Sequence, residues 1–135
     1  MSDTKITQSL TNLANALSRL REALQEPNHS TLVIDGTIQR FEFVLELYWK
    51  TLKRLLANEG IETNTPKETL KKAYAAKWID NEPAWLQMLN DRNATSHIYD
   101  EETARRIYKN IQIHFSELEK TFEKIKERFQ PDRLR

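Results

Sequence analysis

The chain has 135 residues, which is enough for one domain with a hydrophobic core and too few for two comfortable ones. It contains only 2 Gly and 4 Pro, the residues that tight turns require, and this excludes a β-sandwich or barrel with many turns. It has no Cys, hence no disulfide framework, and its net charge of +1 gives no strong indication of a polyanionic partner. The start lacks the pattern of a signal peptide and no apolar run is long enough to span a membrane. We therefore expect a single cytoplasmic helical domain over residues 1–135.

Two long helices are predicted in the first half of the chain. Apolar residues recur there at steps of 3 and 4, which places them on one face of a helix. The first stripe consists of Ile6, Leu10, Leu13, Leu17, Leu20 and Leu24, and the second of Ile34, Ile38, Phe41, Leu45, Tyr48, Leu52 and Leu55. Phe43, Leu47 and Trp49 add apolar surface away from the second stripe, so we expect this helix to bury more than one face.

Capping signals predict three further helices. Thr65-Pro66-Lys67-Glu68 is typical of a capping box with Pro at the first helical position, and predicts a short helix. Asp80 and Pro83 are expected to begin a second short helix, and Asp100 to begin a long one. The apolar stripe of the last helix is Ala104, Ile107, Ile111, His114, Leu118, Phe122, Ile125 and Phe129.

These elements predict an all-α fold. Three long helices, with two short ones that together match a fourth, suggest a four-helix up-down bundle in which one position is split. The surplus apolar surface of the second helix leads us to expect a homodimer with a self-complementary two-fold interface.

The candidate chemistry gathers around His97. His29 is expected to be a surface loop residue, and His114 to be a core or interface histidine. His97 differs, because it lies in the polar segment from Asn90 to Asp100, which also contains Arg92. On an ideal helix Arg92 and His97 would be about 140° apart and would not share a face.

Three arrangements of this polar segment are open. If the helix ends at the weak helix formers Thr95 and Ser96, the imidazole of His97 can swing back toward the Arg92 guanidinium. Alternatively, the pair meets its copy across a dimer axis. In the third arrangement the segment does no chemistry and consists of helix caps and local salt bridges.

Glu42, Glu46 and Lys50 follow one another at helical spacing. They could form an acidic metal site, but an ordinary i, i+4 ion-pair ladder is the favoured interpretation. The sequence has no metal-ligand spacing and no glycine-rich phosphate loop, so we expect neither a metal nor a cofactor.

The segment Arg92-Asn93-Ala94-Thr95-Ser96-His97-Ile98-Tyr99 fits the R-x4-H-x-Y form of a motif found in the HEPN superfamily (higher eukaryotes and prokaryotes nucleotide-binding domains). Asn93 fits as well, because a polar residue commonly follows the motif arginine. Together with residues 38–53 and 85–100, the motif resembles the subfamily of nucleotidyltransferase substrate-binding proteins, which includes the HepT-type toxins. The resemblance covers roughly residues 5–130.

The resemblance implies a homodimeric helical bundle in which two R-x4-H motifs share one cleft. It implies a metal-independent endoribonuclease toxin, and a minimal nucleotidyltransferase partner that acts as antitoxin and adds AMP to the motif tyrosine, here Tyr99. An alternative for the same family is a non-catalytic substrate-binding subunit of a two-part nucleotidyltransferase. On the first interpretation RNA is the substrate, His97 is the acid or base, Arg92 clamps the phosphate, Asn93 positions it, and Asp91 supports the site.

Overall fold

The computed structural model describes residues 3–97 and 100–129 of the chain. Within them the elements are α1 (Asp3–Leu24), α2 (Thr31–Asn58), α3 (Pro66–Ala75), α4 (Glu82–Ala94), the single 3-10 turn η1 (Thr95–His97) and α5 (Glu101–Phe129). This described part contains no β-strand, so the all-α prediction is confirmed. None of its helices is long and apolar enough to cross a membrane.

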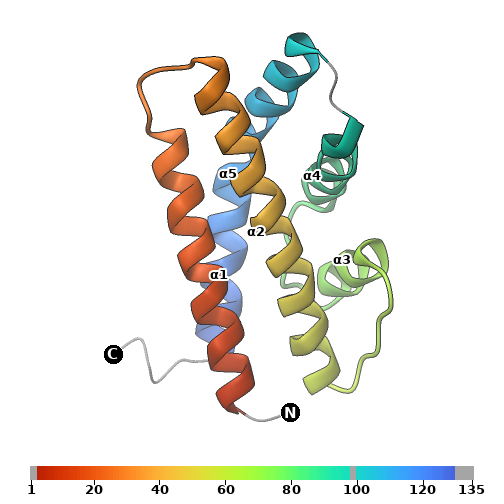
Figure 1. Cartoon of the computed structure of the whole chain (residues 1–135). Coiled ribbons are helices and arrows are strands. Elements are labelled where there is room, and N and C mark those ends of the chain that lie inside the picture. Colours follow the sequence, from red (N-terminus) through yellow and green to blue (C-terminus); the bar gives the residue numbers. More distant parts are fainter. Residues whose placement is uncertain (1–2, 98–99, 130–135) are drawn as a thin grey trace.

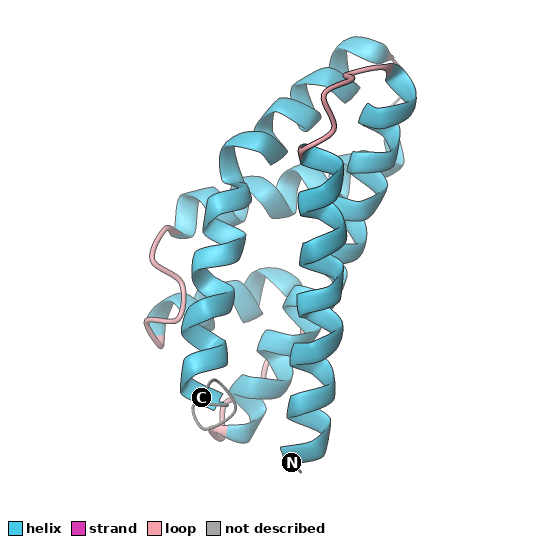
Figure 2. Ribbon diagram, turned by 90° about the vertical axis from the view of Figure 1, so that its left-hand side faces the viewer, coloured by secondary structure: helices cyan, strands magenta, loops and turns pink. Residues whose placement is uncertain are grey.

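The helices form the predicted four-helix arrangement. The long helices α1, α2 and α5 lie side by side, and α3 and α4 together occupy the fourth position along one flank (Figure 1). Seen from the side in Figure 2, the bundle is elongated, with connections at its two ends and a further connection partway along one flank. The chain runs up in α1, down in α2, up through α3 and α4, and down in α5 (Figure 1).

The core forms largely from the predicted stripes. All members of the first two stripes are buried except Leu24, which is half-buried. The second helix does bury more than one face, as expected, but the extra buried side chains are Thr37, Val44, Thr51 and Leu56. The three residues proposed for that role do not enter the core, since Leu47 and Trp49 are half-buried and Phe43 is 57% exposed. The apolar surface of Phe43 therefore faces outward on the bundle.

Two of the three predicted helix starts are confirmed. The Thr65 side chain accepts a hydrogen bond from the Glu68 backbone N–H at 3.1 Å, and Pro66 is the first residue of α3. At α5, Asp100 accepts from the Thr103 N–H at 2.7 Å. The assignment of Asp80 to the start of α4 is wrong, because Asn81 accepts from the Ala84 N–H.

A buried cluster fixes α4 against the two long helices beside it. The rings of Tyr48 on α2 and Trp85 on α4 meet edge to face, with centroids 4.7 Å apart. The Tyr48 hydroxyl donates a 2.6 Å hydrogen bond to the Leu118 carbonyl oxygen of α5. Burial raises the pKa of the Tyr48 phenol well above its ordinary value, so the hydroxyl remains a donor. This cluster sets the position of α4, and with it that of the R-x4-H segment.

Candidate functional site

The R-x4-H segment lies where α4 ends. The α-helix stops at Ala94 and continues as η1, in which the Thr95 hydroxyl donates to the Arg92 carbonyl oxygen at 2.7 Å. The Ser96 hydroxyl donates to the Asn93 carbonyl oxygen at 3.4 Å. Both hydroxyls therefore donate to carbonyl groups in the last turn of the helix, and the Arg92 carbonyl oxygen also accepts the Thr95 backbone N–H. Of the arrangements left open by the sequence, the α-helix does end before Thr95, and His97 is the last residue of the 3-10 turn that follows.

Arg92 is oriented by a carboxylate from another helix. Its Nη2 atom forms an ion pair with Oε2 of Glu46 on α2, and its Nη1 atom lies 3.5 Å from Oδ1 of Asn93. Both partners of the ion pair are about one-third exposed, at 34% and 32%. Sequence reasoning placed Glu46 near Lys50 but did not connect it with Arg92.

Glu46 has two further partners on its own helix. Its Oε1 atom lies 3.1 Å from the Lys50 ammonium, which confirms this part of the predicted ion-pair ladder. The Trp49 indole N–H donates to Oε2 at 3.3 Å. Burial raises the pKa of the Glu46 carboxyl, but the hydrogen bonds from Lys50 and Trp49 and the charge of Arg92 outweigh burial, so that its pKa falls below the ordinary value. Glu46 is therefore ionised at neutral pH and holds Arg92 in place.

The lowered pKa predicts how Glu46 contributes to stability as the pH changes. A carboxyl whose pKa is lower in the folded state stabilises the fold above its unfolded pKa, about 4.5, and loses that contribution as the pH falls through the folded value. We expect Glu46→Gln to unfold more readily at pH 7, by no more than about 1 kcal/mol because the pair is partly exposed. Thermal unfolding from pH 7 to pH 2 should show this deficit shrinking below pH 4.5, whereas a deficit that stays constant would contradict the assignment.

Asp91, the residue before Arg92, points the other way and is buried. Its Oδ1 atom accepts a hydrogen bond from Gln87 Nε2, and Oδ2 accepts one from Asn110 Nδ2 on α5, both at 3.0 Å. A buried carboxylate needs such partners, and here they tie the end of α4 to α5. Asp91 therefore fixes the backbone from which the Arg92 side chain extends.

His97 is exposed at the end of η1 and has no hydrogen bond or ion pair to another residue in the described part of the chain. Asn93 is also exposed. The structure does not bring the side chains of Arg92 and His97 into contact within one chain. Tyr99, expected to be the modified residue, lies outside the described residues.

The other two histidines lie outside the R-x4-H segment. His29 is exposed in the connection between α1 and α2, as predicted, and its Nδ1 atom lies 2.9 Å from the Tyr108 hydroxyl. His114 is half-buried on α5 and does not belong to the core cluster. His97 is therefore the histidine of the R-x4-H motif, and its exposed imidazole is free to meet a ligand.

Within residues 3–97 and 100–129, no three His, Asp or Glu side chains lie close enough together to hold a metal ion. The groups that the site does offer are an imidazole, a guanidinium and an amide. An imidazole exchanges protons near neutral pH, and a guanidinium keeps its charge and presents a planar fork to phosphate oxygens. This set suits proton transfer beside a phosphate.

Comparison with known families identifies the class of protein. Residues 8–129 match the family described as nucleotidyltransferase substrate binding protein like. The chain belongs to this family.

A curated relative and two solved structures agree with that assignment. A Haemophilus influenzae protein described as a probable ribonuclease HepT is 35% identical over 105 residues, which cover 74% of this chain and 72% of the relative. A crystal structure of a Thermus thermophilus protein has a TM-score of 0.74 and 29% identity over 87% of this chain and 98% of that one. A Haemophilus influenzae structure, described as the fold of a substrate binding domain of a nucleotidyltransferase, has a TM-score of 0.66. It is 27% identical and covers 93% of this chain and 99% of that one.

Proposed function

We propose that this chain is an endoribonuclease toxin that cuts RNA without a metal ion and is controlled by a minimal nucleotidyltransferase antitoxin. The observation that carries the proposal is the exposed His97 without a partner in the described part, five residues after an arginine held by Glu46. The likeness to a probable ribonuclease, at 35% identity, supports the same reaction class.

The proposed reaction is an internal phosphoryl transfer within RNA. A base removes the proton of a ribose 2′-hydroxyl, and its oxygen attacks the adjacent phosphorus to form a 2′,3′-cyclic phosphate. The bond to the 5′-oxygen of the next nucleotide breaks, and an acid protonates that oxygen. His97 supplies one proton transfer, the Arg92 guanidinium neutralises charge that develops on the phosphorane, and Asn93 helps to position the phosphate.

The analysis of cleavage products tests this chemistry. A 5′-labelled RNA incubated with the purified chain should yield fragments that end in a 2′,3′-cyclic phosphate, and the downstream fragments should begin with a 5′-hydroxyl. Phosphatase and kinase sensitivity of the isolated fragments distinguishes these ends. Fragments that carry 5′-phosphates would contradict attack by the 2′-hydroxyl.

A second copy of the chain would complete the site. One chain provides a single histidine and a single arginine in this segment, while the reaction needs both an acid and a base. On α2, Gln39, Glu42, Phe43 and Glu46 recur at i, i+3, i+4 and i+7, so they share one face. The outward surface around Phe43 is therefore continuous with the Glu46–Arg92 pair.

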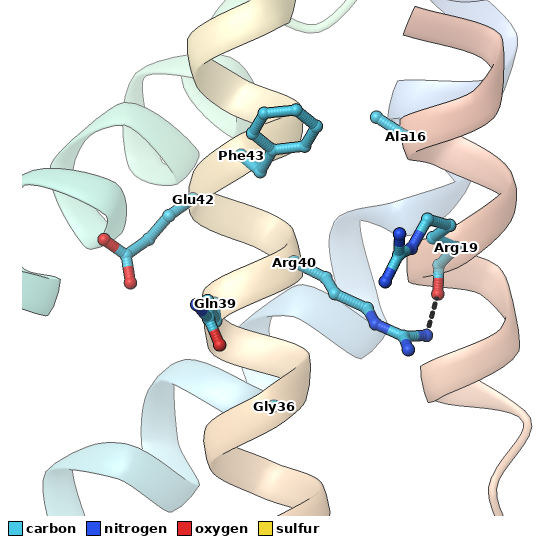
Figure 3. Close-up of a pocket in the computed structure, with 7 residues that line it drawn as sticks. All are labelled: Ala16, Arg19, Gly36, Gln39, Arg40, Glu42 and Phe43. Atoms are coloured by element: carbon cyan, nitrogen blue, oxygen red, sulfur yellow. Dashed lines mark hydrogen bonds between the residues drawn. The ribbon is translucent and has the colours of Figure 1, made fainter. Parts of the chain in front are cut away.

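The shape and charge of this face suit a dimer in which the face of one copy contacts the same face of the other copy. Phe43 borders an open groove of about 720 Å³ between α1 and α2, whose other lining residues include Ala16, Arg19, Gly36, Arg40 and Glu42 (Figure 3). The small residues leave room for an aromatic ring, and the face carries both positive and negative side chains. A two-fold axis can therefore place the ring of one copy against the groove of the other.

We expect Phe43→Asp to convert a dimer into a monomer, because it removes the aromatic ring that the groove of the other copy would bury and replaces it with a carboxylate that must lose its hydration. Sedimentation at micromolar concentration measures the change. Ile113→Asp is the matched control, since Ile113 is 60% exposed on α5 and lies outside the groove. A wild-type chain that sediments as a monomer, or a Phe43→Asp chain that still sediments as a dimer, would contradict this interface.

We also expect Tyr99 to be the point of control by the nucleotidyltransferase. Attaching AMP to its phenol adds an anion two residues from His97, where it can compete with RNA for Arg92. Co-expression with the partner should increase the intact mass by roughly 329 Da, and Tyr99→Phe should remove both the increment and the neutralisation of toxicity. An active partner that leaves the mass unchanged would contradict this control.

A second candidate function is a non-catalytic subunit that presents substrate to a separate nucleotidyltransferase. The family description and the description of one similar structure favour it. The two candidates differ in one result, since only the ribonuclease cleaves RNA when no nucleotidyltransferase is present.

A further inference from the structure

A second groove lies on the flank formed by α3 and α4, apart from the groove beside Phe43. It has a volume of about 510 Å³, and its lining includes Lys67, Pro83, Leu86, Gln87, Asn90 and Asn93. Because Asn93 is next to Arg92, the groove reaches the proposed cleavage site, and its lining comes from α4 and the first turn of α3.

The floor of this groove carries a row of side-chain amides. Gln87, Asn90 and Asn93 recur every three residues along α4, so they follow one another along the same side of the helix. Asparagine is a poor helix former, and Asn90 is exposed with no hydrogen bond in the described part of the chain. Gln87 uses Nε2 to hold Asp91, which leaves its carbonyl oxygen available. Neither helix propensity nor core packing accounts for Asn90.

Lys67 adds a positive charge to the lining of the groove. Lys67 lies in the first turn of α3, where the helix dipole disfavours a cation, and it has no ion pair within the described residues. α3 contains three lysines and one glutamate, and of these lysines Lys71 is paired, at 3.8 Å from Glu82. The Lys67 ammonium is unpaired within the described residues, and its position does not stabilise the helix. It is therefore available for an anionic ligand.

We infer that this groove binds a single-stranded segment of the RNA substrate next to the scissile phosphate. The inference rests on the proposed ribonuclease function. Lys67 contacts a backbone phosphate, and the amide of Asn90 hydrogen-bonds to a base edge, for which an amide offers both a donor and an acceptor. The apolar side of the groove, at Pro83 and Leu86, packs against base faces.

The length of the groove agrees with a short strand. From Pro83 to Asn93 the helix rises about 15 Å at roughly 1.5 Å per residue. Stacked nucleotides are spaced by about 3.4 Å along a strand, so this length accommodates about four. Pairing occupies the Watson–Crick edges of the bases and withholds them from the amides, which favours single-stranded RNA as the occupant.

Fluorescence anisotropy with a labelled 12-nucleotide single-stranded RNA of mixed sequence tests the inference. The parent chain carries His97→Ala so that the probe stays intact. We expect Lys67→Ala to weaken binding and to reduce the salt dependence of log K by about one. Asn90→Ala should weaken binding about tenfold and leave that salt dependence unchanged, because an amide releases no counterion.

Two control variants each remove a lysine or an asparagine side chain outside the groove. Lys109→Ala and Asn15→Ala each delete an exposed side chain outside the groove, and we expect both to bind within about twofold of the parent. A fully paired duplex of the same sequence should bind the parent and the Asn90→Ala chain equally. If Lys67→Ala and Asn90→Ala bind the single strand as the parent does, the inference is overturned.

Two further outcomes separate this inference from the proposed function. If the groove variants keep their RNA affinity but no longer bind the co-expressed nucleotidyltransferase, the groove is a protein interface and the inference is overturned. If the chain with its native His97 does not cleave RNA, the ribonuclease proposal fails, while the anisotropy results still decide whether RNA occupies the groove.

Discussion

Replacing His97 with alanine is expected to lower the rate of RNA cleavage by about 10²- to 10⁴-fold, the usual effect of losing a group that transfers a proton in the transition state. The same substitution should abolish growth inhibition when the chain is overexpressed. His97 is exposed and has no hydrogen bond or ion pair in the described part, so its removal breaks no contact there. The melting temperature and helicity of the variant should therefore match those of the wild type.

His114→Ala is the matched control for this experiment. His114 is half-buried on α5 and does not belong to the R-x4-H motif, so its replacement should leave cleavage unchanged. A folded His97→Ala chain that cleaves RNA at the wild-type rate would remove His97 from the reaction. A His97→Ala chain that unfolds would instead show that the segment has a structural role.

Replacing Arg92 with alanine should have the second largest effect. The side chain is expected to neutralise the pentavalent phosphorane, and loss of one such electrostatic group typically costs about 10²- to 10³-fold in rate. Glu46 would keep its contacts with Lys50 and Trp49 in this variant, so its carboxylate would remain paired and the fold should persist. Arg92→Lys retains the charge but loses the planar fork, and we expect intermediate activity.

Arg105→Ala provides the control for loss of an ion-paired arginine. Arg105 pairs with Glu101 on α5 at 3.1 Å, and exposed pairs of this kind contribute little to stability. Cleavage rates of the three variants, measured with the same RNA, separate the effect of charge from that of position. Equal activity of Arg92→Ala and wild type would contradict the role of Arg92 as a phosphate clamp.

The fold could be predicted because the patterns that indicate its helices extend over only a few neighbouring residues. The apolar steps of 3 and 4 in α1 and α2 report which face of each helix is buried, and the stripes coincide with the core. The rule does not say what lies on the remaining faces. Phe43 and Val44 are neighbours in the sequence and both apolar, yet Val44 is fully buried and Phe43 is 57% exposed. Only the position of the surrounding helices distinguishes them.

The N-cap of α4 also depends on contacts that the local sequence does not show. Asp80 and Asn81 are adjacent and both are good N-cap residues. Asn81 caps α4, while the Asp80 carboxylate lies 2.6 Å from the Lys124 ammonium on α5. That ion pair joins residues far apart in the sequence, so no local pattern could have assigned the two roles.

The candidate site was only partly predictable for a related reason. The weak helix formers between Arg92 and His97 left open whether the helix ends inside the motif, and in the structure α4 ends there, at Ala94. The ion pair of Arg92 with Glu46 joins α4 to α2 and follows no helical spacing. The sequence could therefore identify Glu46 as a partner of Lys50 but not as the group that orients Arg92.

Cleavage of RNA by the purified chain in excess chelator is the most direct test of the central claim. We predict that labelled RNA is cut at the same rate with and without the chelator, because His97 and Arg92 supply the proton transfers and the positive charge. The His97→Ala chain, assayed beside it, should leave the RNA intact. Cleavage that stops in chelator, or that persists unchanged in the His97→Ala chain, would contradict the claim.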